Sequence, residues 1–200
     1  MTLELPEGPF KAYLFDCDGT IVDSMPLHYV AWNKVLGEYG AEFDEALFYA
    51  WGGRPVAEII ESLNEMHGIS MPVEETRNRK EKMYFENLSR LKGIPEVIEH
   101  VHLSHGTMRF AVVSGSTRDS VVASLEVLGI LDRFETLVCA GDYTKGKPDP
   151  EPFLMAAERL GVDPKDCLVF EDTAMGIESA TRAGMASVKV LQPWERALAG

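Results

Sequence analysis

The chain has 200 residues, 46% of them hydrophobic, and its 32 acidic residues outnumber 19 basic ones to give a formal net charge of −13. This length and composition can bury the core of one domain, or of one domain with a modest insertion. The negative charge argues against nucleic acid as a partner, because it repels a phosphate backbone. No run approaches the roughly 20 apolar residues that cross a membrane, so no membrane partner is expected.

The start of the chain and its cysteines predict a cytoplasmic protein. Residues 1–10 lack the basic start and long apolar segment of a signal peptide, which argues against secretion. Cys17, Cys139 and Cys167 are odd in number and lie in apolar runs, so we interpret them as small core residues in a reducing compartment. A catalytic thiol at Cys17 is the alternative, but no histidine lies near it in the sequence.

The first predicted element is a buried parallel strand, Ala12 to Phe15, which stops at Asp16 and is followed by Asp18. Ligands of open α/β sheets bind at this end of the strands. One carboxylate there can attack phosphorus and a second can exchange protons with the leaving oxygen. A divalent ion would be needed to hold two acids beside an anionic substrate. An ordinary strand-to-turn segment is the alternative, whereas an EF-hand loop is excluded because Gly19 falls at its fourth position instead of its sixth.

A block with helical periodicity and no strand pattern follows. The spacing of apolar residues predicts helices over residues 24–36, with Ser24 as N-cap, and over 46–51, 56–66 and 73–91. We therefore predict an all-helical domain over residues 24–90, inserted into a core formed by residues 1–23 and 91–200.

From residue 93 onward, strands and helices alternate, which predicts a parallel sheet covered by helices on both faces. The fold class expected is α/β, a doubly wound, Rossmann-like parallel sheet with the helical insertion. The predicted strands are 109–114, 135–140, 167–170 and 186–191, and the predicted helices are 95–105, 119–128, 150–160 and 174–183. Residues 192–200 carry no informative pattern.

Two later segments place polar groups after predicted strands. Ser114-Gly115-Ser116 offers a hydroxyl, backbone N–H groups and a helix N-terminus, which together suit an anion; helix capping by Ser116 or Thr117 is the alternative. Lys147 lies in a loop between turn-forming residues. The sequence there fits a nucleotide-binding P-loop only until Pro148, where magnesium binding needs Ser or Thr.

Glu171 and Asp172 end the strand predicted at 167–170, and Asp172 is also a plausible N-cap for the next helix. In a doubly wound sheet all these strand ends share one edge. The acids, the hydroxyl with its amides and the lysine are therefore predicted to form one site.

The four segments together resemble the motifs of the haloacid dehalogenase superfamily of phosphotransferases: Asp16-Cys17-Asp18-Gly19-Thr20, Ser114-Gly115-Ser116, Lys147-Pro148 and Glu171-Asp172. The resemblance covers nearly the whole chain, and the helical insertion resembles the cap domain of this family. The likeness is closer to the β-phosphoglucomutase-like branch, through Asp23-Ser24, His28, Ala31-Trp32 and Gly53-Arg54. Within that branch the chain resembles the small bacterial fructose-1-phosphate phosphatases, through its short length, Leu36-Gly37-Glu38-Tyr39-Gly40 and Val169-Phe170-Glu171-Asp172.

The resemblance implies a catalytic role for two aspartates. Asp16 would be the nucleophile that becomes an aspartyl phosphate, and Asp18 would serve as general acid and then as general base. Asp16, the backbone carbonyl of Asp18 and Asp172 would bind Mg²⁺, with Glu171 assisting. The charges agree with this, because four carboxylates at one edge repel each other unless Mg²⁺ and Lys147 compensate.

The resemblance also implies substrate-binding residues. Lys147 and the Ser114-Gly115-Ser116 segment would hold the transferring phosphoryl group. His28 and Arg54 would recognise the substrate from the cap, with Lys80 as a looser match. The alternative is that His28 and Lys80 are surface groups of the helices and Arg54 is a charge in a loop.

The expected function is a Mg²⁺-dependent phosphatase of a small sugar or polyol phosphate, acting as a monomer. Asp18 argues against hydrolytic dehalogenation, because dehalogenases of this superfamily normally have a non-acidic residue there. A mutase that moves phosphate between sugar carbons is the first alternative. A catalytically inactive binding protein is the second, although no motif residue is missing.

Overall fold

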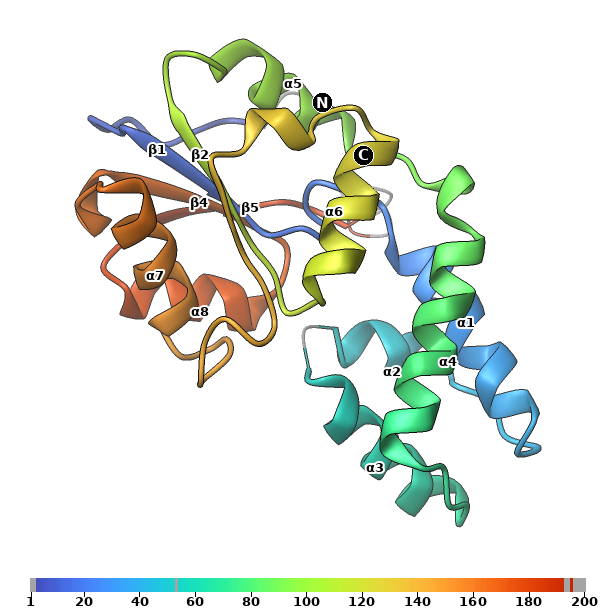
Figure 1. Ribbon diagram of the computed structural model, residues 1–200. Coiled ribbons are helices and arrows are strands. Elements are labelled where there is room, and N and C mark those ends of the chain that lie inside the picture. The colour runs from blue at the N-terminus through green and yellow to red at the C-terminus, as the bar shows by residue number, and fades with distance from the viewer. Residues whose placement is uncertain (1–2, 53, 193–194, 196–200) are drawn as a thin grey trace. The chain divides into compact units, whose positions relative to one another are not determined.

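The computed structural model describes residues 3–52, 54–192 and 195. The chain divides into two compact units (Figure 1). The core unit combines Met1–Asp23 with Lys92–Gly200, and the helical unit is Ser24–Leu91. Among the described residues, no helix is both long and apolar enough to cross a bilayer.

The core unit is built on a five-stranded parallel sheet with the strand order β3-β2-β1-β4-β5. This order places the first strand of the chain in the middle, between two strands that follow much later. The predicted doubly wound parallel sheet is therefore confirmed. The strands are β1 (Ala12–Phe15), β2 (Arg109–Val113), β3 (Thr136–Val138), β4 (Cys167–Glu171) and β5 (Ala186–Lys189).

The strand register brings the predicted motifs together. Phe15 at the end of β1 pairs with Val112 of β2 and Phe170 of β4. One residue further along each strand, Asp16 therefore lies level with Val113 and Glu171. The positions of these site residues thus follow from the pairing of apolar strand residues, not from attraction between charged groups.

Helices cover both faces of the sheet. Figure 1 shows α5 (Pro95–Ser104) and α6 (Arg118–Val127) on one face, and α7 (Glu151–Leu160) and α8 (Ala174–Arg182) on the other. Helix α7 packs on β1, β2 and β3, and α8 packs on β4 and β5. Short 3-10 turns at Leu131–Arg133 and Pro164–Asp166 precede β3 and β4.

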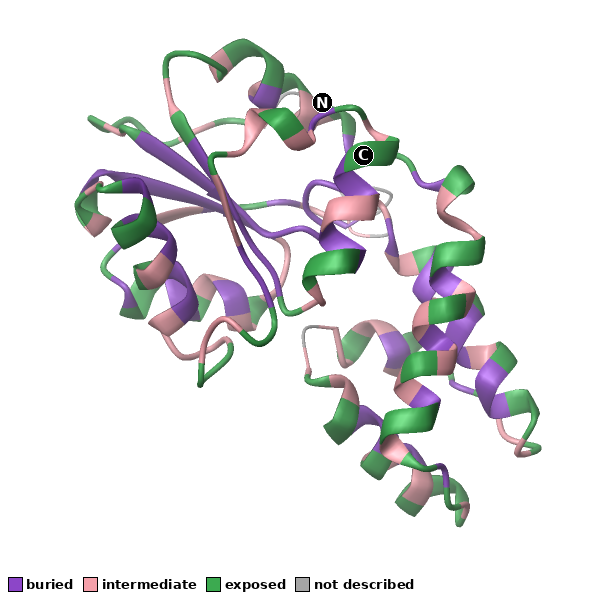
Figure 2. Ribbon diagram, in the orientation of Figure 1, coloured by how far each residue is buried: buried purple, intermediate pink, exposed green. Residues whose placement is uncertain are grey.

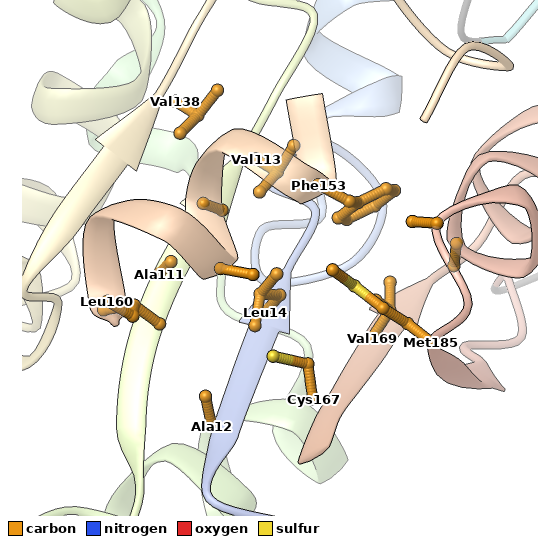
Figure 3. Close-up of a cluster of buried hydrophobic side chains, with 14 residues drawn as sticks. Ala12, Leu14, Ala111, Val113, Val138, Phe153, Leu160, Cys167, Val169 and Met185 are labelled. Atoms are coloured by element: carbon orange, nitrogen blue, oxygen red, sulfur yellow. The ribbon is translucent and has the colours of Figure 1, made fainter. Parts of the chain in front are cut away.

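The layer between the sheet and α7–α8 is a continuous apolar cluster. Small residues of β1 and β2, such as Ala12 and Ala111, let Phe153 and Leu160 of α7 approach the strands closely (Figure 3). The three central strands are buried except at Arg109, as their colour in Figure 2 shows, whereas the edge strands β3 and β5 are only partly buried. Each large apolar side chain buried here contributes about 1.5–3 kcal/mol, so the sheet edge is a stiff base for polar groups.

The helical unit has a core of its own. It consists of α1 (Met25–Gly37), α2 (Glu45–Ala50), α3 (Val56–His67) and α4 (Val73–Glu86), followed by a 3-10 turn over Leu88–Arg90. Trp32, Phe43 and Leu63 belong to its buried cluster. Ser24 stands at the predicted N-cap position of α1, where its side chain makes no capping bond to the helix.

Candidate active site

The ammonium group of Lys147 is the centre of the site. Its Nζ donates hydrogen bonds to Asp16 Oδ1 at 2.6 Å, to Glu171 Oε1 at 2.7 Å and to the carbonyl oxygen of Val113 at 3.0 Å. Burial by itself would lower the pKa of Lys147, but the charges of Asp16 and Glu171 outweigh it and raise the pKa above its ordinary value. The lysine therefore remains a cation and holds the ends of β1 and β4 together.

The loop that carries this lysine is fixed at several points. The hydroxyl of Tyr143 donates to the carbonyl oxygen of Ser114 at 3.1 Å. The carboxylate of Glu151, in the first turn of α7, accepts the backbone N–H groups of Thr144 at 2.8 Å and Lys145 at 2.9 Å. These bonds tie the loop to the end of β2 and to α7, so the lysine projects from a rigid support.

Three carboxylates gather beside the lysine. Asp16, Glu171 and Asp172 each offer an oxygen, and these oxygens lie within 4.8 Å of one another. Burial raises the pKa of Asp16 to about 7, with Lys147 opposing this shift and Glu171 adding to it. Burial, then the charges of Asp16 and Glu171, raise the pKa of Asp172 well above its ordinary value. Hard oxygen donors gathered in one place, with the charges of Asp16 and Asp172 disfavoured, fit a divalent cation such as Mg²⁺.

Both oxygens of Asp172 have hydrogen-bond donors. Thr20 Oγ1 donates to Oδ1 at 2.9 Å, and Gln192 Nε2 donates to Oδ2 at 2.5 Å. Thr173, not Asp172, caps α8 by accepting the N–H of Gly176 at 3.0 Å, so the capping alternative for Asp172 is wrong. Sequence reasoning missed Gln192, which it placed in a segment without informative pattern.

Asp18 is paired with Ser116. Ser116 Oγ donates to Asp18 Oδ2 at 2.6 Å, while the N–H of Ser116 donates to Ser114 Oγ at 3.0 Å. Thr117 caps α6, so capping does not occupy the hydroxyl of Ser116. A Cβ on Gly115 would meet no atom within 4 Å, which leaves the backbone of this turn open to an anion.

Cys17, between the two aspartates, is buried. Burial, followed by the charges of Asp18 and Asp16, raises the pKa of its thiol well above the ordinary value. Because the thiolate is the reactive form, burial and the raised pKa argue against a catalytic thiol here. Cys139 and Cys167 are also free and buried, as expected of core residues.

The predicted substrate residues of the helical unit lie among aromatic rings. His28 is 9% exposed and stacks on Tyr84 with the ring centroids 4.3 Å apart. Lys80 is 8% exposed, and its Nζ lies 6.0 Å from the centroid of Trp32. The alternative that His28 and Lys80 are surface groups is therefore wrong.

Arg54 is held within the same unit. Its guanidinium carbon lies 4.4 Å from the ring centroid of Trp51, and one of its nitrogens donates to Ser62 Oγ at 3.0 Å. Gly53, which contributed to the resemblance, lies outside the described residues.

Comparison with known proteins identifies the family. The family model described as haloacid dehalogenase-like hydrolase matches residues 13–190. The chain belongs to this family. The hydrolase is 35% identical over 182 residues to the fructose-1-phosphate phosphatase YqaB of Escherichia coli, covering 90% of this chain and 96% of that protein. It is 30% identical over 182 residues to the phosphorylated carbohydrates phosphatase of Thermotoga maritima, covering 89% of this chain and 83% of that protein.

A solved structure extends the comparison to the mutases. The β-phosphoglucomutase of Clostridium difficile superimposes on the hydrolase with a TM-score of 0.82 at 27% identity, covering 94% of this chain and 87% of that one. The predicted superfamily, its β-phosphoglucomutase-like branch and the resemblance to a fructose-1-phosphate phosphatase are confirmed. The predicted enzyme class, a phosphatase of this family, is confirmed as well.

Proposed function

We propose that this hydrolase is a Mg²⁺-dependent phosphatase of small sugar or polyol phosphates that acts through an aspartyl phosphate on Asp16. The observation that carries the proposal is the Lys147 ammonium, which is hydrogen-bonded to both Asp16 and Glu171. The proposed nucleophile, a cation that can bind phosphoryl oxygens, and a carboxylate of the cluster are therefore in direct contact. The names of the Escherichia coli and Thermotoga maritima relatives, both phosphatases of phosphorylated carbohydrates, support the substrate class.

The metal belongs to the same proposal. Asp16, Asp172 and the backbone carbonyl of Asp18 would hold Mg²⁺, with Glu171 assisting. When bound, the ion supplies positive charge that neutralises the transferring phosphoryl group. The protein would act as a monomer in the cytoplasm, where its three buried cysteines stay reduced.

In the first step, a carboxylate oxygen of Asp16 forms a bond to phosphorus while the bond from phosphorus to the sugar oxygen breaks. Asp18 donates its proton to that oxygen, so the sugar leaves as an alcohol. Lys147 and the hydroxyl of Ser114 hold the phosphoryl oxygens. The oxygen of Ser114 already accepts the N–H of Ser116, which directs its own proton elsewhere.

In the second step, Asp18 is a carboxylate and removes a proton from water. The water oxygen bonds to phosphorus, the bond to Asp16 breaks, and inorganic phosphate leaves. The hydrogen bond from Ser116 at 2.6 Å orients Asp18 for both transfers. Proton transfer by a positioned group contributes typically about 10²–10⁴-fold to the rate.

A sugar-phosphate mutase is the second candidate function, favoured by the structural similarity to β-phosphoglucomutase. In a mutase the aspartyl phosphate transfers to another sugar hydroxyl instead of water, so the helical unit must act as a cap that excludes water. His28, Arg54 and Lys80 would then bind a sugar phosphate.

A panel of sugar and polyol phosphates with Mg²⁺ tests the proposal, with free phosphate and isomerised sugar phosphate both measured. We expect phosphate release that EDTA abolishes and added Mg²⁺ restores. Ca²⁺ should support little turnover, because it prefers looser geometry and more ligands. Asp16→Asn, which keeps the shape of the side chain, is the matched control and should be inactive.

Isomerisation without phosphate release would favour the mutase. Full activity in EDTA would overturn the magnesium mechanism, and an active Asp16→Asn protein would overturn the nucleophile.

A further inference from the structure

Gln192, the only glutamine in the chain, lies just after β5 and is 4% exposed. Its side-chain Nε2 donates to the carbonyl oxygen of Gly19 at 2.9 Å and to Asp172 Oδ2 at 2.5 Å. The carbonyl oxygen of Gly19 can only accept, so it must face the NH₂ end of the amide. The orientation of this side chain is therefore fixed by its neighbours.

The other end of the amide shows that packing alone does not explain this glutamine. Its buried Oε1 has no hydrogen-bond partner among the residues that the structure describes. A methionine would fill nearly the same volume without burying an unsatisfied acceptor. A glutamine in this place is thus accounted for by its two donated hydrogen bonds.

Those two bonds join the segments that carry the proposed magnesium ligands. Gly19 follows Asp18 after β1, and Asp172 follows β4. The three groups are tightly packed, since a Cβ on Gly19, whose φ is +87°, would lie 2.6 Å from both Asp172 Oδ2 and Gln192 Nε2. Thr20 holds the other oxygen of Asp172, so the carboxylate cannot rotate without breaking a bond.

We propose that Gln192 is a positioning residue for the magnesium site. It fixes the carboxylate of Asp172 relative to the Asp18–Gly19 turn, and it acts through these groups without touching the metal. This inference rests on the proposed magnesium-dependent function. The backbone N–H of Gln192 donates to Glu195 at 2.9 Å, and Glu195 pairs with Lys189 of β5 at 2.5 Å, so the segment that presents the amide is itself anchored to the sheet.

Gln192→Met removes the donors at nearly constant volume. Loss of a group that orients a metal ligand typically weakens metal affinity about 10–100-fold, and we expect the Kd for Mg²⁺ to rise by that factor. At saturating Mg²⁺, kcat should return to within about threefold of wild type, because no reacting group is removed. A merely structural role would instead lower kcat at every Mg²⁺ concentration.

Isothermal titration calorimetry of the metal-free protein with MgCl₂ measures the affinity without using activity. Lys189→Met is the matched control: it breaks the ion pair with Glu195, keeps the amide, and should bind Mg²⁺ within about twofold of wild type. Thermal unfolding establishes that each variant is folded. Should Gln192→Met not fold, Gln192→Leu serves the same test, because its side chain also lacks a donor and adds no charge.

Wild-type affinity in a folded Gln192 variant overturns the inference, as does equal weakening in Lys189→Met, which would show general loosening of the segment. A wild-type protein that binds no Mg²⁺ overturns the proposed magnesium site and this inference with it. Weakened binding in the Gln192 variants alone supports the inference.

Discussion

In the proposed mechanism Asp18 carries out both proton transfers: it protonates the sugar oxygen in the first step and deprotonates water in the second. We expect Asp18→Ala to cut turnover of alkyl phosphates by about 10²–10⁴-fold. With p-nitrophenyl phosphate the leaving group needs little acid, so the first step proceeds and aspartyl phosphate accumulates. Acid-quench mass spectrometry should show a gain of roughly 80 Da, the mass of a phosphoryl group.

Asp16→Ala is the control for this experiment, since it lacks the proposed nucleophile and should gain no mass. Wild-type turnover of alkyl phosphates by Asp18→Ala would show that another group carries the proton.

The pKa of Asp16 makes a prediction about stability. This pKa is raised from an ordinary 3.8 to about 7, so between these values the folded protein holds a proton that the unfolded chain releases. The free energy of unfolding of the metal-free protein therefore falls as pH rises through this window. Asp16→Asn cannot ionise, and its gain in unfolding temperature over wild type should be larger at pH 8 than at pH 5. An equal difference at both pH values, measured by calorimetry in EDTA, would contradict the burial of this charge.

At the residue scale, the sequence predicted the site residues that follow strands, but not the residues that reach the site from other segments of the chain. Asp16 and Glu171 adjoin apolar runs and Lys147 lies in the loop after the third strand of the core, so the shared edge of a parallel sheet predicted that they meet. The pairing of Ser116 with Asp18 depends on which of two neighbouring hydroxyls caps α6. Gln192 reaches the site through the side chain of a single residue after the last strand, and only its being the sole glutamine set it apart in the sequence.

At the scale of the elements, a glycine of helix α8 lets the helix pack closely against the carboxylate of Glu171. A Cβ on Gly176 would overlap the carboxylate of Glu171, which also accepts the N–H of Thr173 at 2.6 Å. Gly176→Ala should therefore push Glu171 away from Lys147, lower kcat/KM, and destabilise the fold by about 1–3 kcal/mol through overpacking. Urea unfolding and steady-state kinetics measure the two effects.

Gly37, in the last turn of α1, is the matched control for this substitution. A Cβ there would meet no atom within 4 Å, so Gly37→Ala should leave the stability unchanged or raise it by up to about 1 kcal/mol. A Gly176→Ala protein that behaves like Gly37→Ala would contradict the close approach of α8 to Glu171.

The helices and strands themselves were largely predictable, because the apolar residues of each follow a clear helical or strand periodicity. The strand at 12–15 and the start of the helix at 56 agree with the structure. Differences occur where tertiary pairing sets the length. The edge strand β3 covers Thr136–Val138 instead of 135–140, since it has a partner only in β2. Helix α4 ends at Glu86 instead of 91, where the side chain of Asn87 bonds back to the carbonyl of Met83 at 2.8 Å and a 3-10 turn follows.

At the scale of the whole molecule, two chain segments connect the units, and they pair with each other. The N–H of Asp23 donates to the carbonyl of Lys92 at 2.8 Å, and the N–H of Ile94 donates to the carbonyl of Ile21 at 2.9 Å. We expect these paired segments to act as a hinge that closes the helical unit over a bound phosphoryl mimic. Small-angle scattering should show a smaller radius of gyration with Mg²⁺ and fluoroaluminate, and no change for Asp16→Asn. An unchanged radius in the wild type would count against closure.

The central position of β1 has a consequence for synthesis on the ribosome. β1 ends at Phe15, but its neighbours begin only at Arg109 and Cys167. At a translation rate of about 5–20 residues per second, synthesis of the first neighbouring strand, β2, begins on the order of 5–20 s after β1 is complete. The helical unit is an unbroken stretch with its own apolar cluster, and it is translated before either neighbour. The strand that precedes the proposed nucleophile is thus the part of the sheet that stays longest without a pairing partner during synthesis.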